Sequence, residues 1–347
     1  MGTVARRLGH TVTMLSRDAR QCELINGIRR NPRQLKEFDL PEGIVATTDP
    51  KEAMEGAEIL IHCIPVQQTA SYLAKIKDLI PDNAIILSTS KGISVETGEL
   101  MCDVLKTALG DKARCAFLSG PSFAKELMTE QPTLAVVAAK DAEVAQRVQF
   151  LLTGRTFRLY SSDDVIGLEL GGALKNALAI GAGMIEGMGF GINTMAAYVT
   201  RACGEMRKIC MARGGRAETL SGLSGFGDLM LTCFGSLSRN RTVGVRLGKG
   251  ESLEQILKTM GEVAEGVATA PMAARLAQES GVECPLLTAI DMLLKGHLSP
   301  ADARAFLMER DMKPEFATPR QSKFQPPGMP APAFPEAKEG KGSGGTS

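Results

Sequence analysis

The sequence predicts a doubly wound α/β domain followed by an all-helical domain, and two contrasts along the chain indicate this. From Thr11 to about Leu159, short β-branched or apolar runs alternate with helical stretches, as in a largely parallel sheet covered on both faces. After Ser161 this alternation stops, and the chain becomes rich in Gly, Ala and Leu, which let helices pack closely. We therefore expect a sheet domain over residues 1–160 and a helical domain over residues 161–313.

Each expected element corresponds to one such run. The expected strands are Thr11–Leu15, Ile44–Thr48, Glu58–Ile64, Ala84–Ser88, Ala116–Leu118, Thr133–Ala138 and Thr156–Tyr160. The helices expected between them are Ala19–Arg30, Gln67–Ile80, Val95–Leu109, Pro121–Met128 and Asp141–Thr153. The helices expected in the second domain lie within Asp163–Met188 and at Asn193–Ala212, Ser252–Met260, Ala268–Ser280, Leu286–Lys295 and Pro300–Met308. Residues 314–347 are too poor in apolar side chains to offset the entropy cost of ordering, which predicts a disordered tail.

Composition narrows the class of ligand. The 347 residues are 44% hydrophobic and 23% charged, as in a soluble globular protein long enough for two domains. A net charge of +1 argues against nucleic acid or an anionic membrane as partner, and we expect no apolar run near the ~20 residues that span a bilayer. Scattered cysteines without a C-x-x-C, and only three histidines, argue against a zinc site or a histidine triad. We expect a small-molecule ligand, no nucleic acid, no membrane and no metal.

Lys175 stands alone among glycine, alanine and leucine in the segment Gly171–Gly183. The glycines three and four residues before it are expected to leave room for its side chain and for a ligand. Desolvation among apolar neighbours would lower the pKa of its ammonium group, which suits a group that transfers protons near neutrality. A lysine at the end of an oligomer seam is the weaker reading, because a solvated lysine normally brings polar neighbours.

Two further segments follow expected strands. Lys91 comes directly after an apolar strand, and the carboxyl ends of strands in an open parallel sheet border the ligand crevice. The plain alternative is a lysine that only reaches solvent. In Ser119–Ala124, Pro121 is expected at the first position of a helix, where free amides could hold an anion, although an ordinary strand-to-helix turn would look the same.

Polar residues of the second domain form two candidate groups. Asp228 and Thr232 are four residues apart, so on a helix they share a face, and Asp228 could accept a hydrogen bond from a cleft lysine or a substrate hydroxyl. Arg239 and Asn240 follow serines that can cap a helix, and a guanidinium beside free amides suits a phosphate dianion. Taken singly, each could also belong to a capped surface helix.

In their order along the chain, these segments resemble the NAD-dependent glycerol-3-phosphate dehydrogenase family from about Thr11 to Lys313. The matching motifs are S-K-G, S-G-P-S-F-A, G-G-A-L-K-N-A-L-A-I-G-A-G, G-F-G-D-L-M-L-T, S-R-N-R-T-V-G and V-A-E-G-V-A-T-A. The resemblance implies a Rossmann-like dinucleotide-binding domain and a helical substrate domain. It also implies hydride transfer between NAD(P) and a phosphorylated triose, interconverting dihydroxyacetone phosphate and sn-glycerol 3-phosphate.

The resemblance implies roles for individual residues. Lys175 would exchange a proton with the C2 oxygen, Lys91 would contact substrate and nicotinamide, and Asp228 would bind the substrate and tune Lys175. The other substrate contacts would be Gly120, Ser122, Thr232, Ser238, Arg239 and Asn240. The other cofactor contacts would be Gly2, Arg17, Pro65, Ala124, Arg239, Val263 and Glu265. Arg17 stands where an acidic side chain would favour NAD, so NAD and NADP both stay open.

The start of the chain departs from the family pattern. Met1-Gly2-Thr3 resembles only the last glycine of the expected G-x-G-x-x-G turn, so we expect a Rossmann-like domain lacking its first strand and glycine-rich turn. An incomplete gene model of a working enzyme and a short, weakly active binding or dimerisation module both account for this. A β-hydroxyacid dehydrogenase acting on a carboxylate is another reading, although the Ser-Arg-Asn-Arg stretch favours a phosphate. We expect a homodimer in the cytoplasm, or in a plastid or other organelle if a targeting segment is missing.

Overall fold

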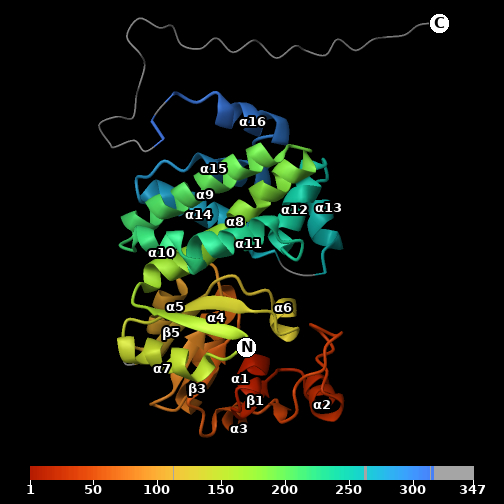
Figure 1. Ribbon diagram of the computed structural model, residues 1–347, viewed down its shortest axis with the longest axis vertical. Helices are drawn as coiled ribbons and strands as arrows, with labels where there is room; N and C mark the ends of the chain where they lie inside the picture. Colours follow the sequence, from red (N-terminus) through yellow and green to blue (C-terminus); the bar gives the residue numbers. More distant parts are fainter. Residues whose placement is uncertain (112, 262–263, 313, 316–347) are drawn as a thin grey trace, which may run out of the picture.

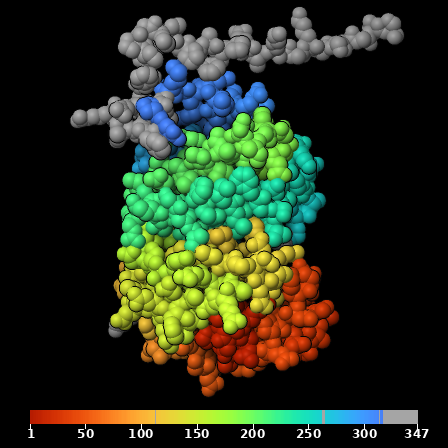
Figure 2. Space-filling view, in the orientation of Figure 1, coloured from red at the N-terminus to blue at the C-terminus, as the bar shows by residue number. Residues whose placement is uncertain are grey.

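The computed structural model describes residues 1–111, 113–261, 264–312 and 314–315. A sheet domain lies at the N-terminal end, and helices α8 to α16 are stacked on one end of it (Figure 1). Figure 2 shows the two domains in contact across the width of the molecule in this view. Of the expected disordered tail, all but residues 314 and 315 lies outside the described residues.

The sheet of the first domain is divided into two pieces. Its strands are β1 (Val12–Leu15), β2 (Ile44–Thr47), β3 (Ile59–His62), β4 (Ile85–Ser88), β5 (Arg114–Ser119), β6 (Thr133–Ala138) and β7 (Phe157–Ser162). Strands β3 to β7 pair in sequence order, all in parallel except β5 with β6, while β1 pairs in parallel only with β2. In the described chain no strand precedes α1 and none joins β1 to β3, as expected for a doubly wound sheet without its first strand.

Helices cover both faces of this sheet, as predicted. They are α1 (Gly2–Arg7), α2 (Ala19–Ile28), α3 (Pro50–Met54), α4 (Val66–Ile76), η1 (Lys77–Leu79), α5 (Met101–Leu109), α6 (Ala124–Met128) and α7 (Ala142–Leu152). The residues of β4 are buried on both sides, and neighbouring side chains of a strand point to opposite faces. Accordingly Leu87 packs in one apolar cluster with Val148 of α7, and Ile86 packs in another with Leu105 of α5.

Two helices of the sheet domain begin later than expected. The expected helix from Val95 starts at Met101, because residues 94–99 close a turn in which the amide of Ser94 donates to the carbonyl of Glu99. Gly98 has a φ of 75° in that turn, a conformation that interrupts a helix. The helix expected from Pro121 starts at Ala124, with Phe123 as its N-cap, so the placement of Pro121 at the first helical position was wrong.

The helical domain is arranged around α8 (Val165–Gly187), whose residues from Gly167 to Met184 are buried. The surrounding helices are α9 (Ile192–Ala212), α10 (Ala217–Ser221), η2 (Leu223–Gly227), α11 (Asp228–Phe234), α12 (Arg239–Gly248), α13 (Leu253–Thr259), α14 (Glu265–Glu279), α15 (Pro285–Leu294) and α16 (Pro300–Met308). A Cβ on Gly244 of α12 would lie 1.9 Å from the carbonyl oxygen of Ile180. Glycine therefore lets the backbones of α8 and α12 touch.

Helix α8 corrects one expectation drawn from composition. By length and hydropathy it is long and apolar enough to span a membrane, whereas no such run was expected. However, 89% of its apolar window is buried inside the protein. Its apolar character therefore fits a helix at the centre of a domain, where other segments of the protein cover it.

Candidate active site

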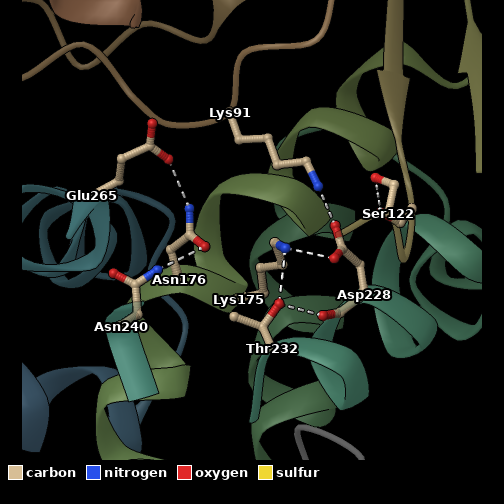
Figure 3. Close-up of polar contacts among 9 residues, drawn as sticks. Lys91, Ser122, Lys175, Asn176, Asp228, Thr232, Asn240 and Glu265 are labelled. Atoms are coloured by element: carbon tan, nitrogen blue, oxygen red, sulfur yellow. Dashed lines mark hydrogen bonds and ion pairs between the residues drawn. The ribbon is translucent and has the colours of Figure 1, made fainter. Parts of the chain in front are cut away.

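Three segments that are far apart in the sequence meet where the helical domain contacts the sheet domain. Lys91 lies in the turn after β4, Lys175 on α8, and Asp228 on α11 (Figure 3). A π-helical turn, η2, leads directly into α11 and brings Asp228 to its first residue. Lys175 and Asp228 are 6% and 1% exposed, so both side chains are buried within the chain.

Asp228 is shared between the two lysines. Its Oδ1 is 2.5 Å from Nζ of Lys175, and its Oδ2 is 2.5 Å from Nζ of Lys91. The ammonium of Lys175 also donates to Oγ1 of Thr232 at 2.9 Å, and that hydroxyl donates to the carbonyl of Asp228 at 2.6 Å. The expected approach of Asp228 to a cleft lysine is confirmed, and Lys91 is held in the same cluster.

Burial and charge set the protonation of this cluster. Burial lowers the pKa of Lys175 to about 8, partly opposed by Asp228 and reinforced by Lys91. Burial alone would raise the pKa of Asp228, but the two ammonium groups hold that pKa below its ordinary value. The carboxylate therefore stays ionised near neutrality, and Lys175 can gain or lose a proton. Two lysines and one carboxylate also leave the cluster net positive, which favours an anionic ligand.

The glycines before Lys175 have a different purpose from the one expected. A Cβ on Gly171 would lie 2.5 Å from the carbonyl oxygen of Ser224 in η2. A Cβ on Gly172 would lie 2.9 Å from Oγ of Ser119 and 3.4 Å from Cδ of Lys91. These glycines make room for η2 and for the aliphatic part of Lys91, so they assemble the site from both domains.

A second polar cluster lies beside the first on α8. Asn176 donates to Oε2 of Glu265 at 3.2 Å and accepts from Nδ2 of Asn240 at 3.0 Å (Figure 3). Oδ1 of Asn240 accepts the amide of Gly266 at 2.8 Å. Asn176 was not identified from the sequence, because the only signal was its position next to Lys175.

Charged groups connect the two clusters. Burial raises the pKa of Glu265, and the positive charges of Arg239, Lys91 and Lys175 oppose that rise. Ser238 caps α12 by accepting the amide of Arg241 at 3.2 Å, as expected for a serine before this helix. The first turn of α12, with Arg239 and Asn240, therefore belongs to the same charged region as the lysines.

The remaining residues implied by the resemblance lie around this region in different settings. Gly120 has a φ of 141°, and its carbonyl accepts the Ser122 hydroxyl at 3.0 Å. Ala124 begins α6, and Pro65 is the N-cap of α4. The turn of Pro65 is joined to that of Lys91, because Ser90 donates to the carbonyl of residue 64 at 2.7 Å.

Two expected cofactor residues stand apart. Gly2 begins α1, and Arg17 is exposed between β1 and α2. Within the described ranges, no hydrogen bond or ion pair joins either residue to the lysine cluster. Val263 lies outside the described residues.

Comparisons with known proteins match both domains. The family model of the NAD-dependent glycerol-3-phosphate dehydrogenase N-terminus matches residues 1–145, and that of the C-terminus matches residues 164–305. A chloroplastic glycerol-3-phosphate dehydrogenase (NAD+) 2 of Arabidopsis thaliana is 46% identical over 307 residues, covering 88% of this chain and 73% of the relative. A glycerol-3-phosphate dehydrogenase (NAD(P)+) of Brucella canis is 43% identical over 315 residues, covering 91% and 95%. The crystal structure of glycerol-3-phosphate dehydrogenase from Coxiella burnetii superimposes with a TM-score of 0.84 at 33% identity, covering 89% and 94%.

Proposed function

The chain belongs to the NAD-dependent glycerol-3-phosphate dehydrogenase family, and we propose that its two domains interconvert dihydroxyacetone phosphate and sn-glycerol 3-phosphate with NAD or NADP. The observation that carries this proposal is the buried Lys175, which shares Asp228 with Lys91 at the junction of the domains. Such an amine can exchange a proton near neutrality, and the second lysine adds positive charge where an oxygen becomes negative.

The proton balance assigns the central role to Lys175. Reduction of the ketone adds a hydride to C2 and a proton to its oxygen, so the ammonium of Lys175 gives up one proton and becomes an amine. Oxidation of the alcohol reverses this step. The bound nicotinamide supplies or accepts the hydride. Both carboxylate oxygens of Asp228 already face lysines, so we propose that Asp228 orients these amines and contacts the substrate less directly.

The phosphate of the substrate is proposed to bind at the start of α12. Arg239 supplies a fixed positive charge there, and a guanidinium can make two parallel hydrogen bonds to a phosphate. Asn240 is held through Asn176 and Gly266, so its side chain is preoriented. The other proposed substrate contacts are Gly120, Ser122, Thr232 and Ser238. Fixing the phosphate lowers the entropic cost of bringing C2 to Lys175.

The residues present fit one end of a dinucleotide better than the other. The turn at Pro65 is tied to that of Lys91 by a hydrogen bond. A Cβ on Gly92 would lie 3.4 Å from Cγ1 of Val66, so the two turns pack closely at the carboxyl ends of β3 and β4. We propose that Pro65, Lys91 and Ala124 hold the nicotinamide end. For the pyrophosphate, the described chain offers the free first-turn amides of α1, which begins at Gly2.

Turnover of the purified full chain tests the proposal. Oxidation of NADH and of NADPH at equal concentration, with dihydroxyacetone phosphate, measures both activity and cofactor preference. Lys175→Met removes the proton donor and is expected to reduce kcat by roughly 100-fold or more. Lys208→Met on α9 serves as a matched control, because that lysine is exposed and donates to the carbonyl of Glu283, away from the lysine cluster. Folded wild-type protein without turnover would refute the proposed activity.

We further propose a homodimer, supported by apolar side chains left exposed at spacings of four along η2 and α11. These are Phe226, Met230 and Phe234, with Leu237 just beyond. Light scattering of the wild type and of Met230→Glu would test this interface, and an unchanged mass would reject it.

For the compartment we propose the cytoplasm, with a plastid as the alternative because the Arabidopsis relative is named chloroplastic. Imaging of a fluorescent fusion distinguishes the two.

A further inference from the structure

Glu169 is a buried carboxyl group that the proposed reaction does not use. It lies on α8, six residues before Lys175, and is 9% exposed. Its two oxygens lie 3.1 and 3.3 Å from the amide nitrogen of Cys102, which donates to them. Cys102 is in the first turn of α5, where the N-cap Leu100 provides no side-chain acceptor. Glu169, on a helix of the helical domain, therefore provides a hydrogen-bond acceptor for a free amide at the start of α5 in the sheet domain.

A small cavity separates Glu169 from the turn that carries Lys91. It has about 10 Å³ of space open to a water-sized molecule, and Lys91, Ser119, Glu169 and Gly172 are among the residues that line it. Such a space admits about one water molecule when polar partners surround it. The hydroxyl of Ser119 is fully buried and has no hydrogen-bond partner among the described residues. The cavity therefore contains one polar group that lacks a partner.

The aliphatic part of Lys91 crosses α8 beside this cavity. A Cβ on Gly172 would lie 3.4 Å from both Cγ and Cδ of Lys91 and 2.9 Å from Oγ of Ser119. A Cβ there would collide with Oγ of Ser119 and would make ordinary van der Waals contact with Lys91. The aliphatic part of Lys91 thus packs against α8, and the same side chain forms the ion pair to Asp228.

The surroundings of Glu169 favour its protonated form at neutral pH. Burial raises the pKa of this carboxyl to about 8, and the negative charge of Asp103 acts in the same direction. The hydrogen bonds from the thiol and the amide of Cys102, and the positive charge of Lys140, oppose the rise. Burial raises the pKa of the neighbouring Cys102 thiol, so this thiol stays neutral. Burial raises the pKa of the Cys115 thiol on β5 in the same way. Lys91 is the other charged group that lines the cavity.

We propose that Glu169 is a positioning residue for Lys91: its protonated carboxyl donates a hydrogen bond to a water that Ser119 also contacts, which fixes the Lys91 turn against α8. This inference rests on the proposed function, because it assumes that Lys91 meets the substrate. Protonated glutamic acid can accept the Cys102 amide with one oxygen and donate with the other. Ionisation removes this donor and places a negative charge behind Lys91, where it opposes the approach of an anionic substrate.

The test is the pH dependence of KM in wild type and in Glu169→Gln. Glu169→Gln keeps an acceptor for Cys102 and a donor toward the cavity but cannot ionise. For wild type, KM for dihydroxyacetone phosphate is expected to rise roughly threefold or more between about pH 7 and about pH 9, because one unit of charge appears near the ligand. For Glu169→Gln, the rise in KM is expected to be smaller than in wild type, because only the part caused by deprotonation of Lys175 is retained, together with the fall of kcat.

Glu169→Ala and Glu254→Gln complete the comparison. The alanine variant leaves the Cys102 amide without its acceptor, so its KM is expected to be raised at every pH. Glu254 is an exposed acid on α13, and its variant should follow wild type. Parallel KM profiles for wild type and Glu169→Gln would overturn the proposal, and so would a Glu169→Gln variant as impaired as Glu169→Ala. Wild type and Glu169→Gln decide the question even if the alanine variant does not fold.

A binding measurement separates this inference from the proposed function. Calorimetry with sulfate, which does not titrate in this range, gives a dissociation constant at each pH without turnover. Its affinity for wild type is expected to fall as pH rises, and Glu169→Gln should reduce that fall to the part caused by deprotonation of Lys175. Absent turnover with this sulfate result would reject the proposed function and keep the role of Glu169. Normal turnover with identical sulfate profiles would reject only the role of Glu169.

Discussion

Replacing Asp228 by asparagine tests how the charged cluster controls Lys175. The carboxylate is 2.5 Å from each ammonium group, and it opposes the fall in the pKa of Lys175 caused by burial. Asparagine keeps the shape and removes the charge. The pKa of Lys175 should therefore fall further below about 8, so less of the proton donor is present at neutrality.

The size of the shift follows from the contact distances. At an effective dielectric constant of about 20, unit charges at this separation attract by ~7 kcal/mol. Because the same carboxylate is shared with Lys91, and because side chains and water rearrange, we expect a net change of ~1–2 pKa units, or ~1.4–2.8 kcal/mol. The loss of folding stability at neutral pH should be of similar size, since Lys175 can release its proton instead of staying charged without a partner.

The assay is the rate of ketone reduction from about pH 6 to about pH 9. The wild-type rate should fall as pH rises past about 8, where Lys175 loses its proton. In Asp228→Asn this fall should begin ~1–2 pH units lower, and kcat near neutrality should drop by roughly 2- to 10-fold. Asp82→Asn, at an exposed position before β4, is the matched control. An Asp228→Asn profile that coincides with wild type would refute this account of the cluster.

Three other substitutions give independent checks. Lys91→Ala removes a charge that lowers the pKa of Lys175, so the alkaline fall in rate should move to higher pH while KM rises; a fall that moves to lower pH would contradict this sign. Arg239→Ala should abolish turnover of the phosphorylated triose, and phosphite should restore turnover of an unphosphorylated analogue; unaffected turnover would favour a carboxylate substrate. Gly244→Ala forces a Cβ to within 1.9 Å of a carbonyl oxygen of α8 and should destabilise by ~3 kcal/mol or more in urea unfolding. Gly204→Ala, a glycine of α9 with open space around it, should instead stabilise by ~0.5–1 kcal/mol, and equal effects of the two would contradict the packing argument.

Much of the fold could be predicted from the sequence, because the local pattern of apolar residues agrees with their burial in the structure. The predicted strand Ala84–Ser88 is apolar at four of its five positions, and β4 is buried on both faces, as a central parallel strand requires. The start of α5 was misplaced because residues 95–100 carry helix-compatible side chains. Their conformation is set by hydrogen bonds within the turn and by Gly98, and periodicity does not reveal these.

The site was predictable to the extent that its chemistry lies in single residues. A lone lysine in an apolar helix predicted burial and a lowered pKa, and both are found for Lys175. The sharing of Asp228 by two lysines was not predictable from spacing, because Lys91 and Asp228 are 137 positions apart. Glu169 was missed for a similar reason, since its partner Cys102 belongs to the other domain.

The division of the sheet into two pieces affects how the protein unfolds locally. Strands β1 and β2 are hydrogen-bonded to each other, but among the described residues no backbone ladder connects them to β3. Among the described residues, contacts such as the hydrogen bond between the His10 ring and the carbonyl of Leu151 join this part of the chain to the rest of the domain. Without a shared backbone ladder, the pair can separate as a cooperative unit of its own at a lower free energy than global unfolding. Amide hydrogens of β1 should accordingly exchange with deuterated solvent long before those of β4, and a dinucleotide lying across the seam would slow that exchange by bridging the two units.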